Sequence, residues 1–182
     1  ASAPKNSETI DVTVKIATKT DGSKGRGSSW LSQLKENDEI AFLGPSGKFF
    51  FAAPNEKQVI FVATGTGVAP FRSMIEDQLN KGSKQKMHLI FGVRHIKDIF
   101  YREIFEELAQ KHENFTFDLT LSRPEDDSWQ GSKGRVTEQL KNYDTENSQA
   151  YICGLNDMIQ SVKTILLEKG MAEEDVHFEK YD

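Results

Sequence analysis

A glycine-rich turn constrains the fold of this chain more than any other feature. An apolar run at residues 59–63 leads into Thr-Gly-Thr-Gly-Val-Ala-Pro-Phe-Arg at residues 64–72, and a helical pattern follows. Gly65 and Gly67 allow a tight reversal and a close approach of backbone N–H groups to a ligand, while Pro70 suits a first helical turn. The segment predicts a strand, a turn and a helix whose start favours a phosphate group.

The turn alone leaves two interpretations open. In the Gly-x-Gly-x-x-Gly fingerprint of dinucleotide-binding proteins the last position is glycine, and here it is Pro70. A tight strand-to-helix connection that binds no ligand is therefore an alternative to a nucleotide site.

Composition excludes several classes of protein. The chain of 182 residues is 37% hydrophobic, which is enough for a buried core, and no apolar run reaches the length of a membrane span. Its one cysteine, Cys153, excludes an internal disulfide, a cysteine-ligated iron–sulfur cluster and a multi-thiolate zinc site, and it suits the cytoplasm. The histidines have no metal-ligand spacing, and the net charge of −5 argues against nonspecific nucleic-acid binding. Any redox chemistry must therefore use a bound organic cofactor.

Strand-like and helix-like patterns alternate from residue 56 onward. This alternation predicts an α/β fold, a five-stranded parallel sheet with helices on both faces. Ligands of such sheets gather at the carboxyl ends of the strands, where the strand order reverses. The expected strands are residues 59–63, 87–92, 115–121, 150–153 and 176–181, and the expected helices are residues 71–79, 101–108, 136–140 and 158–166.

The chain has a different character before residue 56. Residues 10–16 alternate apolar and polar like a half-buried strand, and residues 39–43 have the composition of another. Two or three strands cannot cover their own edges, so we expect residues 1–55 to be part of a larger antiparallel β domain and residues 56–182 to form the α/β domain. A glycine loop at residues 25–31 offers a second helix start to a phosphate.

Taken together, these segments resemble the ferredoxin–NADP reductase family, flavoproteins that pass electrons between a nicotinamide nucleotide and a one-electron carrier. The resemblance covers nearly the whole chain, and its motifs occur in the order of the family. They are the end of the Arg-x-Tyr-Ser-x-x-Ser flavin motif at residues 1–4, the flavin-pyrophosphate loop at 25–31, the barrel-closing turn at 44–47, the nicotinamide-domain signature at 65–72, and the segments 98–103, 153–155 and 177–181.

The resemblance implies FAD and NADPH as cofactors and hydride transfer between them. Electrons would pass singly to or from ferredoxin, flavodoxin or an oxygenase component. The Arg-x-Tyr-Ser segment and the front half of the FAD-binding barrel would precede Ala1. We therefore expect residues 1–55 to be a partial FAD-binding barrel that holds FAD poorly, with a further amino-terminal part in the parent protein.

The resemblance also assigns roles to residues at the end of the chain. Cys153 would lie beside the nicotinamide C4, Glu179 would assist with protons and charge near the flavin, and Tyr181 would stack on the flavin and move to admit the nicotinamide. A buried structural cysteine and a surface glutamate are the alternatives, and Asp182 follows Tyr181 where plant-type members end. The residues expected to bind cofactors are Gly27, Ser28 and Ser29 on the flavin side and Gly65, Thr66, Gly67, Pro70, Arg94, Ser122, Arg123, Lys133, Arg135 and Gly154 on the nucleotide side.

The choice between NADPH and NADH depends on Ser122 and Arg123. A 2′-phosphate is bound by a guanidinium and a hydroxyl, whereas a free ribose hydroxyl is bound by an acidic side chain. Lys133 and Arg135 can complete a phosphate clamp, which favours NADPH. The acidic residues 125–127 lie close in sequence and keep NADH open, as in a reductase component of an oxygenase or a haem-domain fusion. A redox-silent nucleotide-binding module is the alternative from another class.

Overall fold

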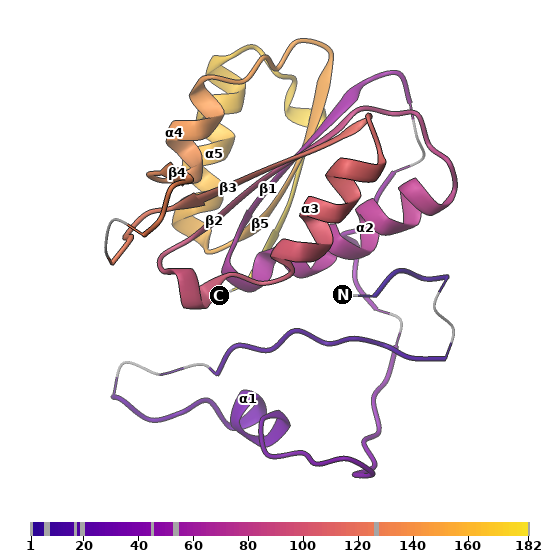
Figure 1. The fold of residues 1–182 in the computed structure, drawn as a ribbon, viewed down its shortest axis with the longest axis vertical. Helices are drawn as coiled ribbons and strands as arrows, with labels where there is room; N and C mark the ends of the chain where they lie inside the picture. The colour runs from indigo at the N-terminus through magenta and orange to yellow at the C-terminus, as the bar shows by residue number, and fades with distance from the viewer. Residues whose placement is uncertain are drawn as a thin grey trace.

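A parallel sheet organises the chain from residue 58 onward (Figure 1). The structure, a computed structural model, describes residues 2–5, 8–16, 18, 21–44, 46–52, 55–125 and 128–181. The strand order is β4-β3-β2-β1-β5-β6, and every pairing is parallel. The strands are β1 (Gln58–Thr64), β2 (Met87–Val93), β3 (Phe115–Leu121), β4 (Ser132–Lys133), β5 (Ser148–Gly154) and β6 (Val176–Lys180).

The five predicted strands are confirmed, and β4 is an additional one. It pairs with β3 through Thr120 and Leu121 at the edge of the sheet. Two residues are too few to show an alternation of apolar and polar side chains, so periodicity in the sequence could not reveal this strand.

The predicted helices are confirmed as well. Pro70 lies in the first turn of α2, and Gly170, with a φ of +88°, follows the end of α5. The helices are α1 (Arg26–Leu31), α2 (Ala69–Asn80), α3 (Arg102–Lys111), α4 (Val136–Lys141) and α5 (Asn156–Glu168), with short 3-10 helices at Gly65–Val68, Ile96–Asp98 and Glu173–Asp175. In the described part of the chain no helix is both long and apolar enough to cross a bilayer.

Helices cover both faces of the sheet (Figure 1). Phe61 of β1 packs with Phe71 of α2 in the core under α2 and α3, whereas Ile60 and Val62 pack with Val162 of α5 in the core under α4 and α5. Successive side chains of a strand point to opposite faces, so the central strand β1 supplies both cores and is apolar from Val59 to Ala63.

The amino-terminal segment has little regular structure. Among its described residues are helix α1 and an isolated bridge between Thr18 and Lys24, and neither residues 10–16 nor residues 39–43 form a strand. The expectation of two strands here was wrong, because neither segment forms the backbone hydrogen bonds of a strand. An alternating pattern shows which side chains face a core, but a strand also needs a neighbouring backbone to pair with.

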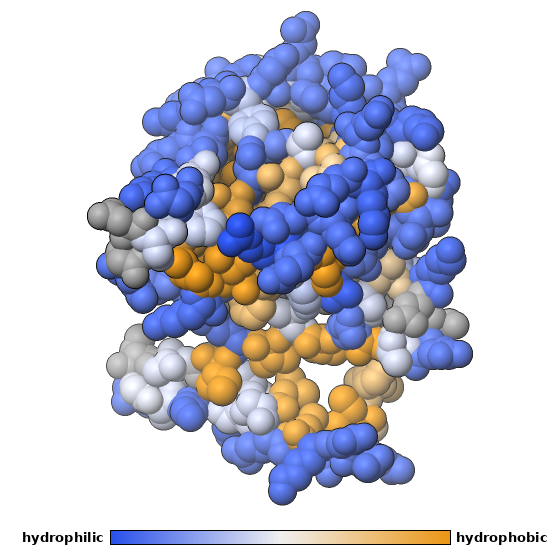
Figure 2. Space-filling model, in the orientation of Figure 1, coloured by the Kyte–Doolittle hydropathy of each residue, from blue (hydrophilic) through white to orange (hydrophobic). Residues whose placement is uncertain are grey.

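Several large apolar side chains of this segment are exposed. Figure 2 shows their hydrophobic surface as orange patches on the lower part of the molecule. The exposed fraction reaches 102% for Leu43 and 71% for Phe42. Apolar groups that alternate along a chain and stay in water are typical of a surface that normally packs against another element. Members of this set are Ile10, Val12, Phe42, Leu43 and Phe50.

The end of the segment is anchored on the sheet. Phe49 and Phe51 pack against the core under α2 and α3, and the rings of Phe51 and Tyr151 stack with centroids 5.3 Å apart. The N–H of Ala52 donates to the Tyr151 hydroxyl at 3.1 Å. These contacts connect the amino-terminal segment to β5.

Candidate functional site

The strand order reverses between β1 and β5. The chain passes from β1 through α2 to β2 on one side, continues to β3 and β4, and returns through α4 to β5 on the other side of β1. In open α/β sheets the crevice at such a reversal, outside the carboxyl ends of the strands, is the place where ligands bind. Thr64 ends β1 and Gly154 ends β5, so the predicted glycine turn lies at this crevice.

Close approach of two backbones explains the glycines of the turn. A Cβ added to Gly67 would lie 2.2 Å from the carbonyl oxygen of Cys153, which is too close for any side chain. A Cβ on Gly154 would lie 2.3 Å from Thr64 Oγ1. Gly65 differs, because its φ of +55° favours glycine while the space beside it is open. Its backbone is therefore accessible to a ligand.

The three residues predicted to act in catalysis lie together. Cys153 on β5 pairs in register with Glu179 on β6, and the N–H of Tyr181 donates to the carbonyl of Gly154 at 3.0 Å. The Tyr181 side chain hydrogen-bonds the Cys153 thiol. Cys153 is completely buried and Tyr181 is 42% exposed, so the tyrosine lies between the thiol and solvent.

The environment keeps both hydrogen-bonded side chains protonated. Burial, followed by the negative charge of Glu179, raises the pKa of the Cys153 thiol to about 12, and the hydrogen bond from Tyr181 opposes this only in part. Burial also raises the pKa of Tyr181, with further contributions from the neighbouring Cys153 and Glu179. At neutral pH the site therefore presents a neutral, polarisable thiol and no thiolate nucleophile.

Backbone pairing brings the residues predicted to form a phosphate clamp to adjacent strand ends. The N–H of Arg123 donates to the carbonyl of Arg94 at 3.0 Å, and that of Ser122 donates to Val93 at 3.0 Å. Leu121 lies in register with Lys133 of β4. These pairings place the ends of β2, β3 and β4 beside one another.

The arginines of this region are exposed. Arg94, Arg123 and Arg135 all lie at the surface, and within the described ranges none of their guanidinium groups forms an ion pair. Arg135 precedes α4, where its N–H donates to Glu138 Oε2 at 3.2 Å. Three exposed guanidinium groups without a described ion pair are suited to binding an anion.

The nearby acidic residues are described in part. Glu125 Oε1 lies 3.1 Å from His95 Nδ1 and 3.9 Å from Lys97 Nζ. Asp126 and Asp127 fall outside the described residues. The carboxylate of Glu125 therefore faces basic partners of its own.

The predicted flavin loop contains an unmatched hydroxyl. Ser28 Oγ donates to the carbonyl of Gly25 at 3.3 Å, whereas Ser29 Oγ is buried and has no hydrogen-bond partner among the described residues. The space beside Gly27 is open. A buried hydroxyl without a partner and an accessible backbone fit a phosphate group of FAD.

Comparison with known proteins places this site in a family. Residues 61–164 match the family described as "Oxidoreductase NAD-binding domain", which is more than half of the chain. Ferredoxin--NADP reductase B of Sorangium cellulosum is 35% identical over 100% of this chain and 76% of its own length. The chain belongs to the ferredoxin–NADP reductase family.

Other relatives of the family are longer than this chain. One component of the Na(+)-translocating NADH-quinone reductase of Neisseria meningitidis is 36% identical over 97% of this chain, which covers 46% of that protein. The chain thus spans about half the length of the curated relatives of this kind.

Solved structures show the same fold as this member of the ferredoxin–NADP reductase family. The cytochrome b5 reductase domain of Ulva prolifera nitrate reductase superimposes with a TM-score of 0.77 at 20% identity, over 92% of this chain and 70% of that one. The ferredoxin-NADP+ reductase of Plasmodium falciparum with 2'P-AMP gives a TM-score of 0.72 at 23% identity, over 92% of this chain and 70% of that one.

Sequence reasoning missed residues that support the site in this ferredoxin–NADP reductase relative. The buried hydroxyl of Thr120 donates to the carbonyl of Gly134 at 2.9 Å and holds the loop after β4. Thr64 packs against Gly154 across the crevice. Tyr101, at the start of α3, has a left-handed φ of 59°, which no local pattern in the sequence announces. The position of Thr64, at the end of an apolar strand and directly before the glycine turn, was the sequence feature that could have marked it as a site residue.

Proposed function

We propose that this chain is the nucleotide-binding part of a flavoprotein that transfers hydride between NADPH and FAD. One observation carries the proposal: Cys153, Glu179 and Tyr181 come together at the crevice between β1 and β5, beside the glycine turn. A reaction between two cofactors needs a protein that positions them more than it needs an acid or a nucleophile. A neutral thiol flanked by a movable aromatic ring meets that need.

The residues of the crevice bind and orient the nucleotide. The open backbone at Gly65, followed by Thr66, the closely packed Gly67 and Pro70 at the start of a twelve-residue helix, receives the pyrophosphate. Gly154 allows the end of β5 to approach the turn closely.

The residues at the end of β5 and β6 act on the reacting ring. FAD, when bound, accepts the hydride and releases its electrons one at a time. Cys153 presents a small uncharged surface that lets the nicotinamide approach to about 3–3.5 Å of its reaction partner. Tyr181 shields this thiol until the nucleotide arrives and then moves aside, and Glu179 contributes negative charge next to both.

The preference for NADPH rests on the exposed cations beyond β2 and β3 and around β4. Arg123 and Ser122 supply a guanidinium and a hydroxyl to a 2′-phosphate, and Lys133 and Arg135 follow on the neighbouring strand and helix start. Arg94 is hydrogen-bonded through its carbonyl to Arg123 and belongs to the same group.

NADH is the second candidate nucleotide. Several relatives are named as components of an NADH-quinone reductase, and Glu125 lies two residues after Arg123, where an acidic side chain can accept a ribose hydroxyl. The Glu125 side chain is 62% exposed and its carboxylate lies 3.9 Å from Lys97 Nζ, so it is accessible to a ribose hydroxyl.

The amino-terminal segment fits the back part of an FAD-binding barrel. The flavin pyrophosphate would be held by the unmatched hydroxyl of Ser29, the open backbone of Gly27 and the adjacent Ser28. The exposed apolar side chains of this segment support a partner surface supplied by a preceding part of the polypeptide. A ferredoxin, a flavodoxin or an oxygenase component would receive the electrons.

Parallel calorimetric titrations of the chain with 2′-phospho-AMP, AMP, NADPH and NADH test the proposal. Binding of 2′-phospho-AMP at least about tenfold tighter than AMP would support NADPH, because a bound 2′-phosphate adds charge-assisted hydrogen bonds. Equal binding of the two would favour NADH. Absence of binding by all four would overturn the nucleotide site.

A further inference from the structure

A group of interacting side chains around Arg72 joins the amino-terminal segment to the nucleotide-binding domain. Arg72 of α2 lies at its centre, with Asp11 Oδ2 3.0 Å from Nη1 and Glu76 Oε1 2.9 Å from Nε. The guanidinium carbon lies 4.6 Å from the centre of the Tyr101 ring. The Tyr101 hydroxyl in turn hydrogen-bonds Thr13. We call Arg72, Tyr101, Asp11 and Thr13 the Arg72 cluster.

The requirements of helix α2 do not explain why an arginine occupies position 72. It lies in the first turn of α2, where the helix dipole is positive and a cation is unfavourable. Its side chain is only 15% exposed, so it is not a solvated surface group. Its neighbours explain its position, because two carboxylates and an aromatic face surround the guanidinium on separate sides.

Tyr101 is held in a conformation that is uncommon for its type. Its φ of 59° lies in the left-handed region, which costs a non-glycine residue free energy that the surrounding contacts must offset. This conformation accompanies a ring that lies over Arg72 and a hydroxyl that reaches Thr13. Backbone strain of this kind concentrates at functional positions.

The Arg72 cluster contacts the amino-terminal segment at two alternate residues, Asp11 and Thr13. Asp11 is bound through Arg72 and Thr13 through Tyr101, and Thr13 is less exposed than the residues on either side of it. The N–H of Asp11 also donates to Ser2 Oγ at 3.0 Å, so the beginning of the segment is tied to the same point.

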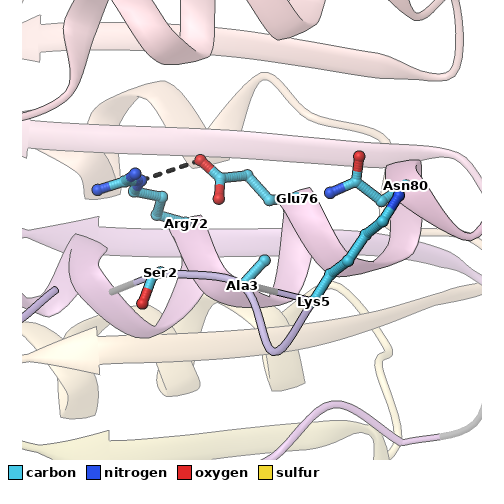
Figure 3. A pocket seen from close by; sticks show the side chains of 6 residues that line it. All are labelled: Ser2, Ala3, Lys5, Arg72, Glu76 and Asn80. Carbon is cyan, nitrogen blue, oxygen red and sulfur yellow. Dashed lines mark hydrogen bonds and ion pairs between the residues drawn. The ribbon is translucent and has the colours of Figure 1, made fainter. Parts of the chain in front are cut away.

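Apolar packing at this junction is incomplete. Figure 3 shows Ser2 and Ala3 alongside α2, next to the Arg72–Glu76 ion pair. A cavity of about 240 Å³ lies there, lined by Ser2, Ala3, Lys5, Arg72, Glu76 and Asn80. The polar contacts of the Arg72 cluster therefore lie beside an open hollow between the amino-terminal segment and α2.

We propose that Arg72 and Tyr101 are positioning residues that set the placement of the amino-terminal segment relative to the glycine turn. This inference rests on the proposed function, in which that segment holds the flavin and the turn holds the nucleotide. Arg72 lies five residues after Gly67, so the cluster acts next to the nucleotide site without using a nucleotide contact. An error of about 1 Å in placement is enough to slow such a reaction strongly.

The first test measures the geometry of the chain itself. Nitroxide labels on Lys15→Cys and Gln110→Cys, two exposed sites, report the distance between the segment and α3 by pulsed EPR. Cys153 is completely buried and takes up no label. We expect a narrow distance distribution for the parent chain and a broad one for Arg72→Met. A distribution as narrow as that of the parent would overturn the proposal.

Arg102→Met is the matched control. Arg102 pairs with Glu106 one turn further along its helix at 2.7 Å and lies 5.6 Å from the Trp129 ring, so it resembles Arg72 in chemistry. It is exposed and lies on α3, outside the Arg72 cluster. Its removal should leave the distance distribution unchanged, and broadening equal to that of Arg72→Met would count against a specific role for the cluster.

The second test uses the complete flavin-loaded protein. In Arg72→Met we expect the hydride-transfer rate at saturating NADPH to fall by about tenfold or more, with the nucleotide Kd within about twofold of the parent value. Tyr101→Phe keeps the ring and removes one hydroxyl, so it decides the matter if Arg72→Met fails to fold. Unchanged transfer rates would refute the positioning role. If the parent protein oxidises neither NADPH nor NADH, the proposed function fails while the EPR result still decides the role of the cluster.

Discussion

Cys153 lies in a site that suppresses its ionisation. Its pKa is raised from 9.0 to about 12, and the thiolate fraction falls tenfold for each unit. We expect iodoacetamide at pH 8 to alkylate the folded chain about a thousandfold more slowly than a free thiol. Mass spectrometry of timed samples measures this rate. The control, Lys15→Cys in a Cys153→Ala background, should be alkylated at the rate of a free thiol. An equal alkylation rate for native Cys153 would contradict its burial.

The same thiol makes stability depend on pH in the alkaline range. The unfolded chain loses the Cys153 proton above about pH 9, while the folded chain keeps it up to about pH 12. Because the folded state then binds more protons, the free energy of unfolding falls as pH rises through this window. Between pH 8 and pH 10 the contribution of Cys153 to this fall is about 1 kcal/mol. Urea unfolding of the parent and of Cys153→Ala at both pH values isolates this contribution, since Tyr181 remains in each protein. The same change in the free energy of unfolding between pH 8 and pH 10 in both proteins would exclude it.

Arg123 is expected to distinguish the two nicotinamide nucleotides. Loss of one charge-assisted hydrogen bond to a 2′-phosphate corresponds to about 1.5–3 kcal/mol, so Arg123→Ala should raise the Kd of 2′-phospho-AMP roughly 10- to 100-fold. The Kd of AMP should change by less than about twofold. Lys97→Ala, an exposed cation near the same loop, is the control. Equal losses for both ligands would remove Arg123 from the phosphate clamp.

At the scale of elements, the strand–turn–helix unit depends on two glycines for different reasons. Gly67→Ala places a Cβ against the carbonyl of Cys153 on β5, and neither backbone can yield easily. We expect a loss of about 2–4 kcal/mol in the free energy of unfolding. Gly65→Ala meets open space and suffers only from its φ of +55°, so its loss should be about 1 kcal/mol. Urea unfolding compares the two, and equal losses would contradict the close approach of the turn to β5.

For the whole molecule, the two parts of the chain should differ in backbone protection. The strands of the sheet hold their amides in continuous ladders, whereas residues 10–16 have no ladder among the described residues. We expect hydrogen exchange in residues 10–16 to be complete within seconds to minutes, and exchange in β3 to be slower by orders of magnitude. Mass spectrometry of peptic peptides measures both. Protection of residues 10–16 equal to that of β3 would mean that this segment is paired in solution.

The sequence by itself determined the five longer strands and the main helices of residues 56–182, and the edge of the sheet at which their carboxyl ends meet. Runs such as residues 59–63 and stripes such as residues 71–79 show their periods locally, and parallel strands bring their carboxyl ends to one edge. Gly65, Ser122, Arg123, Cys153 and Tyr181 could therefore be placed at one edge of the sheet from the sequence alone.

Only the tertiary structure decided how distant segments meet. Strand β4 has two residues and no readable period, and the register that faces Cys153 with Glu179 depends on which strands become neighbours. Thr13 and Tyr101 are 88 positions apart and meet through a left-handed residue that no local pattern predicts. Local periodicity follows from the geometry of one segment, whereas pairing and cavities depend on the free energy of the whole packed chain.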